Sequence, residues 1–293
     1  MTRRKVFQRE ITQTDSFQVT ATDLQAVENV GLYRLILGEQ LLQLHWPMPS
    51  QRRHGESRLR GLFHQGWLDR QPFQDGPARP RAVYSLGKQG RLRVAEKLGV
   101  PASQVGPRPA KERAHDALFL KHHLATVQVV INLRHAAEQL GGGVVHYQDE
   151  RALKASRLRD CVSMPVIPDA FVVLSVNGGV QSFCIETDRA TVDLRAWKRR
   201  FRAYWQFAKT QMFRKDFAKP VVLIVVASDV SLAKRRVTIL KQTLDSEALE
   251  TGCDPSLFWV TTLEQAVPHA VLSDVIWAVG GQDGHFGLLG GGH

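Results

Sequence analysis

The sequence has few cysteines, only three among 293 residues, at positions 161, 184 and 253. An odd number of widely spaced cysteines fits neither a disulfide framework nor a paired-cysteine zinc site. The chain also lacks an apolar run near the roughly 18 residues that a membrane-spanning helix needs. No apolar signal-peptide core follows the basic stretch 1–10. These absences predict a cytoplasmic protein with reduced cysteines and no membrane partner.

Acidic residues are in the minority. The chain has 28 Asp and Glu residues and 39 Lys and Arg residues, which gives a formal net charge of +11 and a sequence pI of about 9.9. Such a chain attracts polyanions, of which nucleic acid is the commonest in cytoplasm. The positive net charge favours a nucleic-acid partner but does not establish one, because proteins without such a partner can also carry excess charge.

The N-terminal third shows helical periodicity three times before two short strands. The apolar spacing predicts helices from Thr22 to about Ile36, after Gly38, and between Ser50 and Gly66. A basic loop at 72–81, a strand at 82–86 and a helix at 88–98 follow. This order predicts a winged helix-turn-helix domain over residues 21–99, behind a flexible arm at 1–20.

In a winged helix, the third helix enters the major groove of DNA and the wing contacts its backbone. The sequence therefore predicts double-stranded DNA as the partner, bound through phosphate and base-edge contacts. A solvated basic helix face is the alternative. The candidate DNA-binding residues on the third helix and the wing are Arg52, Arg53, Arg58, Arg60, Arg79 and Arg81.

Proline without periodicity predicts a linker at 100–113. Beyond it, residues 114–278 alternate helices and strands, which predicts a mixed sheet flanked by helices, an α+β or α/β fold. The Gly-rich residues 279–293 have little apolar content and are expected to be disordered. The helices are expected at 115–140, 194–209 and 232–249, and the strands at 144–147, 171–176, 180–185, 221–227 and 256–260.

The stretch 166–189 predicts a β-hairpin with acidic residues at its ends. Two apolar strands flank Asn177-Gly178-Gly179, residues that tolerate the positive φ of a tight turn. Asp169 precedes the first strand, and Glu186 and Asp188 end the second. Acids brought together either bind a cation or raise a pKa. Alternatively, Asp169 only opens a strand and Asp188 forms a local ion pair.

Pro168-Asp169 ahead of Glu186-Thr187-Asp188, within an α-β-β-β-α-β order, resembles the PD-(D/E)xK nuclease-like core. With a winged helix in front, the chain resembles the replication-relaxation family of plasmid and mobile-element proteins over about residues 22–230. The matching pieces are V-Y-S-L-G-K-Q-G, His123, I-P-D-A-F, I-E-T-D-R-A-T, Lys198 and Tyr204.

The resemblance implies a site in which Asp169, Glu186 and Asp188 hold Mg²⁺ or Mn²⁺. Asp188 occupies the position of the lysine in the PD-(D/E)xK motif. Lys198 is therefore the candidate catalytic residue in place of that lysine. Glu150 is a possible further acid. Two functions stay open. One is a DNA-binding protein of a plasmid or mobile element with a non-cleaving nuclease-like domain, acting in replication, mobilisation or their regulation. The other is a Mg²⁺-dependent nuclease that uses Asp169, Glu186 and Lys198.

Other residues have structural explanations. His122 and His123 lack the companion ligands of a metal site and are expected to pack or cap. The aromatic residues of 194–209 are expected in a core or interface, although the arginines among them leave a nucleic-acid channel open. A homodimer and contacts with replication or transfer proteins are expectations from the class of protein.

Overall fold

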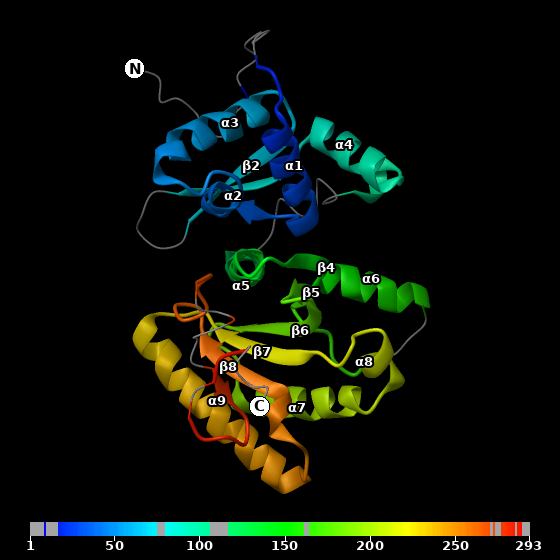
Figure 1. Ribbon diagram of the computed structural model, residues 1–293, viewed down its shortest axis with the longest axis vertical. Coiled ribbons are helices and arrows are strands. Elements are labelled where there is room, and N and C mark those ends of the chain that lie inside the picture. The colour runs from blue at the N-terminus through cyan, green and yellow to red at the C-terminus, as the bar shows by residue number, and fades with distance from the viewer. Residues whose placement is uncertain are drawn as a thin grey trace. The chain divides into compact units, whose positions relative to one another are not determined.

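The structure is a computed structural model that describes residues 9, 17–74, 80–105, 117–160, 164–269, 272, 277–284 and 286–288, without the side chains of 157–160 (Figure 1). Its contacts divide the chain into two units, Met1–Val127 and Gln128–His293, called unit 1 and unit 2. Arg79, most of the predicted arm and most of the predicted linker lie outside the described residues.

Unit 1 contains four complete α-helices and a three-stranded sheet among its described residues. The sheet has the order β1-β3-β2, and both pairings are antiparallel. The order of elements is the one that the sequence analysis associates with a winged helix. The bounds are α1 Ala21–Tyr33, β1 Ile36–Leu37, α2 Gly38–His45, α3 Arg52–His64, β2 Leu68–Phe73, β3 Arg81–Leu86 and α4 Lys88–Leu98.

The first helix is shorter than its apolar pattern predicts. It ends at Tyr33, and Arg34 has a φ of 67°, outside the helical region. Ile36 and Leu37 instead form β1, opposite Tyr84 and Val83 of β3. Short apolar runs fit a helix stripe and a buried strand equally well, so tertiary pairing decides here.

Unit 2 is built on a six-stranded mixed sheet, which confirms the predicted fold class. Its order is β4-β5-β6-β7-β8-β9, with the pairings from β4 to β6 antiparallel and those from β6 to β8 parallel. The predicted hairpin turn is present, with positive φ at Asn177 and Gly178. The bounds are α5 Ala117–Gln139, β4 Gly143–Asp149, α6 Glu150–Asp160, β5 Ala170–Val176, β6 Gly179–Asp188, α7 Leu194–Ala208, α8 Gln211–Lys215, β7 Val221–Val226, α9 Val230–Thr251, β8 Phe258–Thr262 and β9 Ala278–Val279.

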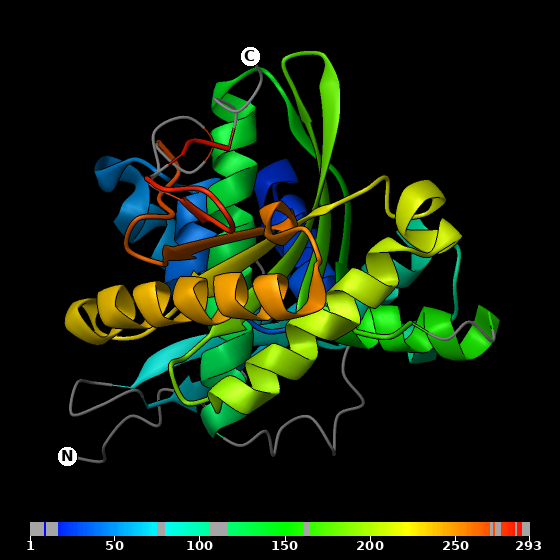
Figure 2. The same ribbon diagram turned by 90° about the horizontal axis from the view of Figure 1, so that it is seen from below.

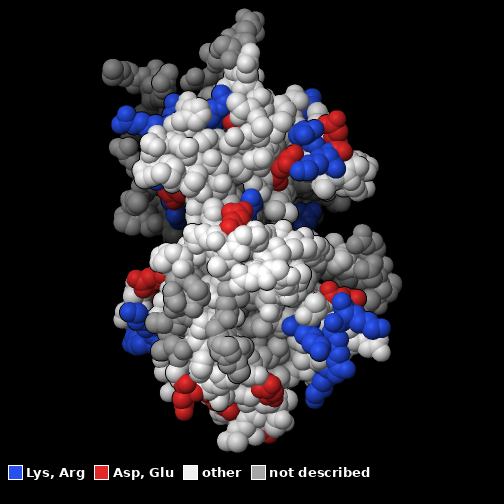
Figure 3. Space-filling view, viewed as in Figure 1, with Lys and Arg blue, Asp and Glu red and all other residues white. Residues whose placement is uncertain are grey.

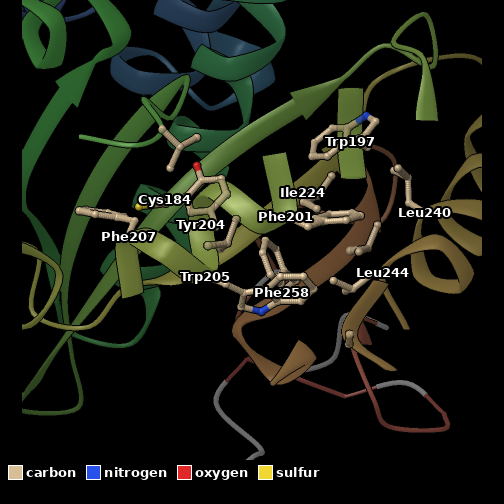
Figure 4. Packing of buried hydrophobic residues seen from close by; sticks show 14 of the residues in the cluster. Cys184, Trp197, Phe201, Tyr204, Trp205, Phe207, Ile224, Leu240, Leu244 and Phe258 are labelled. Atoms are coloured by element: carbon tan, nitrogen blue, oxygen red, sulfur yellow. The ribbon is translucent and has the colours of Figure 1, made fainter. Parts of the chain in front are cut away.

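Helices cover both faces of this sheet. Helices α7 and α9 lie on one face, and the C-terminal half of α5 lies on the other (Figures 1 and 2). Between α7, α9 and the sheet is an aromatic core centred on Phe258 (Figure 4). The rings of Phe201, Tyr204 and Trp205 lie 5.1, 5.7 and 5.7 Å from that of Phe258. This packing fixes the face of α7 that meets the sheet.

Helix α5 belongs to both units. Its residues Leu120 and Leu124 are buried in a cluster with side chains of unit 1, and Gln40 Nε2 donates a hydrogen bond to Leu124 O at 2.9 Å. Further along, Asn132 Nδ2 donates to Ala266 O at 2.6 Å within unit 2. The division between the units therefore falls inside a helix, at Val127.

The sequence analysis missed α6 and α8, and its C-terminal tail begins too early. Val279 lies in β9, where it pairs with Trp259, and Trp277 and Phe286 exchange backbone hydrogen bonds of 3.0 Å. Part of the segment 279–293 is therefore ordered against the sheet. No described helix combines the length and the apolar character that crossing a membrane requires.

Candidate functional site

The carboxylate of Glu186 is the centre of the predicted acidic site. It lies in β6 and is only 2% exposed. The hydroxyl of Tyr204 donates a hydrogen bond to Glu186 Oε1, and Arg200 Nη2 lies 2.5 Å from Glu186 Oε2. Both partners come from α7, one helical turn apart. Both oxygens of the carboxylate are therefore engaged by the helix that packs on the sheet.

Asp169 is held beside Glu186 by backbone pairing at the start of β5. Its amide donates to Ile185 O at 3.0 Å, and its Oδ2 accepts a hydrogen bond of 2.8 Å from the amide of Thr187. The peptide units on both sides of Glu186 thus fix Asp169. The structure confirms that these two acids are neighbours, as the hairpin pattern predicts.

Burial raises the pKa of Glu186 to about 7, because desolvation penalises the charged carboxylate. Arg200 opposes this rise and the nearby negative charge of Asp169 adds to it. The hydroxyl of Tyr204 is buried too, and its pKa lies well above its usual value for the same reason. The site is thus a buried, charge-coupled cluster between the sheet and the middle of α7.

Asp188 does not join this cluster, which corrects the predicted set of three acids. Its Oδ2 is 2.6 Å from Arg236 Nε of α9, and its Oδ1 accepts a hydrogen bond of 2.9 Å from Ala190 N. Arg236 also donates to Val192 O at 2.6 Å. Asp188 therefore ties the end of β6 to α9 and to the loop before α7.

Lys198 is not the cation of the site either. Its Nζ lies 2.8 Å from Glu247 of α9, which also accepts a hydrogen bond of 2.7 Å from Arg202. Arg200 is two positions after Lys198, so the two side chains point in nearly opposite directions around α7. Arg200 is the residue that sequence reasoning missed. Its spacing of four from Tyr204, which was already a matching piece, was the available signal.

The residues do not fit the Mg²⁺ or Mn²⁺ that the nuclease resemblance implies. Arg200 already supplies the cation at Glu186, and Arg236 supplies the one at Asp188. Over the described part of the chain, no three His, Cys, Asp or Glu side chains come together in an arrangement that could hold a metal ion. Glu150 pairs with Lys154 at 2.5 Å on the surface of α6.

A second group of candidate residues surrounds a cavity in unit 1. This cavity, of about 390 Å³, lies between α2, α3 and the strands β2 and β3. Three predicted DNA-binding residues line it, Arg52, Arg60 and Arg81, together with Arg70, which the sequence analysis did not name. Arg52 and Arg81 also contact acidic residues, at 3.3 Å to Glu56 and 3.5 Å to Glu39. The cavity is thus concave and predominantly cationic.

Arg53 is exposed on α3, whereas Arg58 is not available for DNA. Arg58 forms an ion pair with the fully buried Asp23 of α1, donates to Gln18 O at 2.6 Å and stacks 4.1 Å from the ring of Phe17. The prediction for Arg58 is therefore corrected, because α3 turns this side chain toward α1. Arg79 falls outside the described residues.

The histidine and the aromatic residues behave as structural groups. His123 Nε2 lies 3.0 Å from both Tyr33 O and Leu35 O, at the C-terminal end of α1. On α7, Trp197, Phe201 and Tyr204 are at most 3% exposed. Buried rings cannot stack on bases, so the aromatic residues of α7 form a core and not a nucleic-acid platform.

Comparison with known proteins gives one family. A family model described as Replication-relaxation matches residues 29–222, about two thirds of the chain. No curated protein matches. Among solved structures, the chain is similar to that of the restriction endonuclease FokI, with 11% sequence identity and a TM-score of 0.28. The alignment covers 83% of this chain and 43% of the other, and its TM-score is too low to carry an argument about function.

The raised pKa of Glu186 predicts that the stability of unit 2 depends on pH. Between the ordinary value of 4.5 and about 7, the folded state holds a proton that the unfolded state has lost. The free energy of unfolding therefore falls as pH rises through this window, by about 3 kcal/mol, and the contribution is lost above pH 7. Urea unfolding at pH 5 and pH 8 measures it. Glu186→Gln removes the titrating group and should reduce the difference in the free energy of unfolding between pH 5 and pH 8. If this difference were the same in the variant as in the wild type, the assignment to Glu186 would be wrong.

The ion pair of Arg58 with Asp23 predicts a structural phenotype. Arg58→Ala leaves a buried carboxylate without its cation, which should destabilise unit 1 by about 3 kcal/mol. Arg53→Ala, on the exposed face of the same helix, is the matched control and should change stability by less than about 0.5 kcal/mol. Urea denaturation of both full-length variants measures this. Equal stability of the two variants would show that Arg58 is not structural.

Proposed function

Since this chain belongs to the replication-relaxation family, we propose that it is a DNA-binding protein that serves the replication or transfer of a plasmid or other mobile element, or the regulation of these processes. In this proposal, unit 1 is a winged helix that recognises duplex DNA. Unit 2 is a nuclease-like domain that does not cleave DNA. The family supports a role in the replication or transfer of a mobile element. The side-chain contacts within each unit support the role proposed for that unit.

The observation that carries the DNA-binding role is the cationic surface of unit 1. Arg52, Arg53 and Arg60 project from α3 into solvent, and Arg81 stands at the start of β3, beside the loop of the predicted wing. The guanidinium group binds phosphate through two parallel hydrogen bonds, and it also reads guanine in the major groove. Helix α3 is the third helix of the unit, the one that enters the groove in winged-helix proteins.

The arrangement of α3 explains how one helix can serve both packing and recognition. Leu59, Leu62 and Phe63 are buried against the rest of unit 1, and Arg58 is fixed on α1. These contacts hold the helix rigidly, so the exposed arginines are presented on a fixed backbone. Such preorganisation lowers the entropic cost of binding.

The argument against cleavage rests on the occupied carboxylates of unit 2. Metal-dependent hydrolysis needs carboxylate oxygens that are open to a divalent cation and to water. Both oxygens of Glu186 are engaged by Arg200 and Tyr204 in a buried setting. The arginine neutralises the site internally, so the acidic pair fixes the position of α7 on the sheet rather than binding a metal.

The proposed DNA contact predicts a specific loss of binding. In full-length protein, Arg52→Gln, Arg53→Gln and Arg60→Gln together should weaken binding to duplex DNA at least tenfold. They should also reduce the salt dependence of log K by about 2 to 3, because each lost phosphate contact contributes about 0.9. Fluorescence anisotropy over a series of NaCl concentrations measures both quantities.

The control for this experiment removes three cations from another part of unit 1. Arg91, Arg93 and Lys97 lie on α4, and changing all three to glutamine gives the same net charge. This variant should bind DNA more tightly than the α3 variant. If the α3 variant kept the affinity and the salt slope of the wild type, α3 would not be the DNA-binding helix.

The non-cleaving role predicts that supercoiled plasmid stays intact with the purified protein and Mg²⁺ or Mn²⁺. Glu186→Gln and Asp169→Asn serve as matched variants of the acidic pair. Metal-dependent nicking by the wild type that disappears in both variants would overturn the proposed role and establish the nuclease alternative. Nicking that persists equally in both variants would come from a contaminating enzyme.

A further inference from the structure

Helix α7 carries a row of exposed cations on the side opposite its aromatic core. Arg195, Arg199 and Arg202 of α7 and Lys209, which follows its last residue in helical conformation, are all exposed, and they follow a spacing of four, three and seven residues. Residues at this spacing lie on one face of an α-helix. Gln206, at the remaining position of the row, is exposed as well. The helix therefore has one face buried on the sheet and one continuous basic face in solvent.

The basic face continues beyond α7. Arg214 and Lys215 of α8 are exposed, as is Lys219 after it. Residues 189–219 contain ten Lys and Arg but only two Asp and Glu, a net charge of +8 against +11 for the whole chain. In Figure 3, Lys and Arg side chains gather over the region of α8 and the adjoining end of α7. Most of the excess charge of the protein thus belongs to this one segment.

These cations differ from others in unit 2 in having few acidic partners. Arg134, Lys154 and Lys241 each pair with an acid four residues away on the same helix. On the basic face, Arg202 shares Glu247 and approaches Glu250 at 3.9 Å. Among the described residues, Arg195, Arg199, Lys209, Arg214 and Lys215 have no carboxylate within ion-pair distance. Mutual repulsion makes such an arrangement costly unless an anionic partner relieves it.

We propose that the basic face of α7, continued by α8, binds the phosphate backbone of duplex DNA. Lys209 is 14 positions after Arg195, so the row has a length of about 21 Å at 1.5 Å per residue. One strand of duplex DNA carries a phosphate about every 3.4 Å along the axis, so several phosphates come within reach. The proposal goes beyond the winged-helix contact, because it gives unit 2 a DNA-binding surface of its own.

The packing of α7 favours duplex DNA over other polyanions. Single-stranded nucleic acid is held by aromatic side chains that stack on bases, but Trp197, Phe201 and Trp205 are all buried. An anionic membrane binds helices whose apolar face is free to enter the lipid, whereas that face of α7 is packed on the sheet. What α7 offers is a row of charges without apolar or base-reading groups, which suits contact with a regular backbone irrespective of sequence.

The test compares full-length wild type with two variants of equal net charge. The α7 variant carries Arg195→Gln, Arg199→Gln and Lys209→Gln. The control carries Arg134→Gln, Lys154→Gln and Lys241→Gln, whose cations are already paired with acids. Binding to a random-sequence duplex is measured by fluorescence anisotropy at several NaCl concentrations, and circular dichroism verifies that both variants fold.

We expect the α7 variant to lose about tenfold or more in affinity and about 2 to 3 in the slope of log K against log salt, as three lost phosphate contacts require. The control variant should keep an affinity and a salt slope close to those of the wild type. An α7 variant with wild-type affinity and slope would overturn the proposal. So would equal losses in both variants, because net charge alone would then explain binding.

The variant of α3 described above separates this proposal from the proposed function. Loss of binding in the α7 variant, with the α3 variant unchanged, would support the basic face and refute the winged-helix contact. Loss of DNA binding in the α3 variant alone would support the winged-helix contact and refute the basic face. If the α7 variant binds duplex DNA normally but loses binding to an acidic polypeptide such as polyglutamate, the surface is not a DNA site.

Discussion

The contact between the buried Glu186 carboxylate and the side chains of Arg200 and Tyr204 is the constraint on which unit 2 depends. A carboxylate at 2% exposure is costly unless hydrogen bonds and a cation compensate for its lost hydration. Both compensating groups come from α7, so the helix can occupy only one rotation and one height on the sheet. That rotation places the aromatic residues on Phe258 and, because the period of the helix is fixed, turns Arg195, Arg199 and Lys209 into solvent. Core, acidic pair and basic face are thus three consequences of one placement.

The fold was largely predictable because its elements carry strong local signals. The hairpin is specified by Asn177 and Gly178 between two apolar strands, and α4 is bounded by Gly87 and Gly99 where the sequence indicated. The failures occur where the local signal is weak. Among the described side chains of helix α6, Leu153 is the one buried apolar residue, and α8 is a single short turn of helix, so neither shows a clear period. Strand β1 has only two residues, which no pattern distinguishes from the end of a helix.

Less of the candidate site could be predicted, because long side chains choose partners that are distant in sequence. The neighbourhood of Asp169 and Glu186 follows from strand pairing, which the hairpin fixes. The partners of Asp188, Lys198 and Arg58 are Arg236, Glu247 and Asp23, which lie 35 to 49 positions away. Helix α7 has arginine or lysine at five of its positions, so several cations have nearly equal reach. Only the rotation of that helix decides which of them meets the acid, and tertiary packing sets the rotation.

Helix α5 limits how this protein can be divided or recombined. Its first half supplies Leu120, Leu124 and a carbonyl partner for Gln40 to unit 1, while its second half covers the sheet of unit 2. A cut in the proline-containing segment 100–113 would strip unit 1 of part of its core, although composition marks that segment as the natural joint. An exchange of unit 1 between related proteins would therefore have to carry the chain through residue 127, and a recombination point within a helix has to preserve its periodicity on both sides.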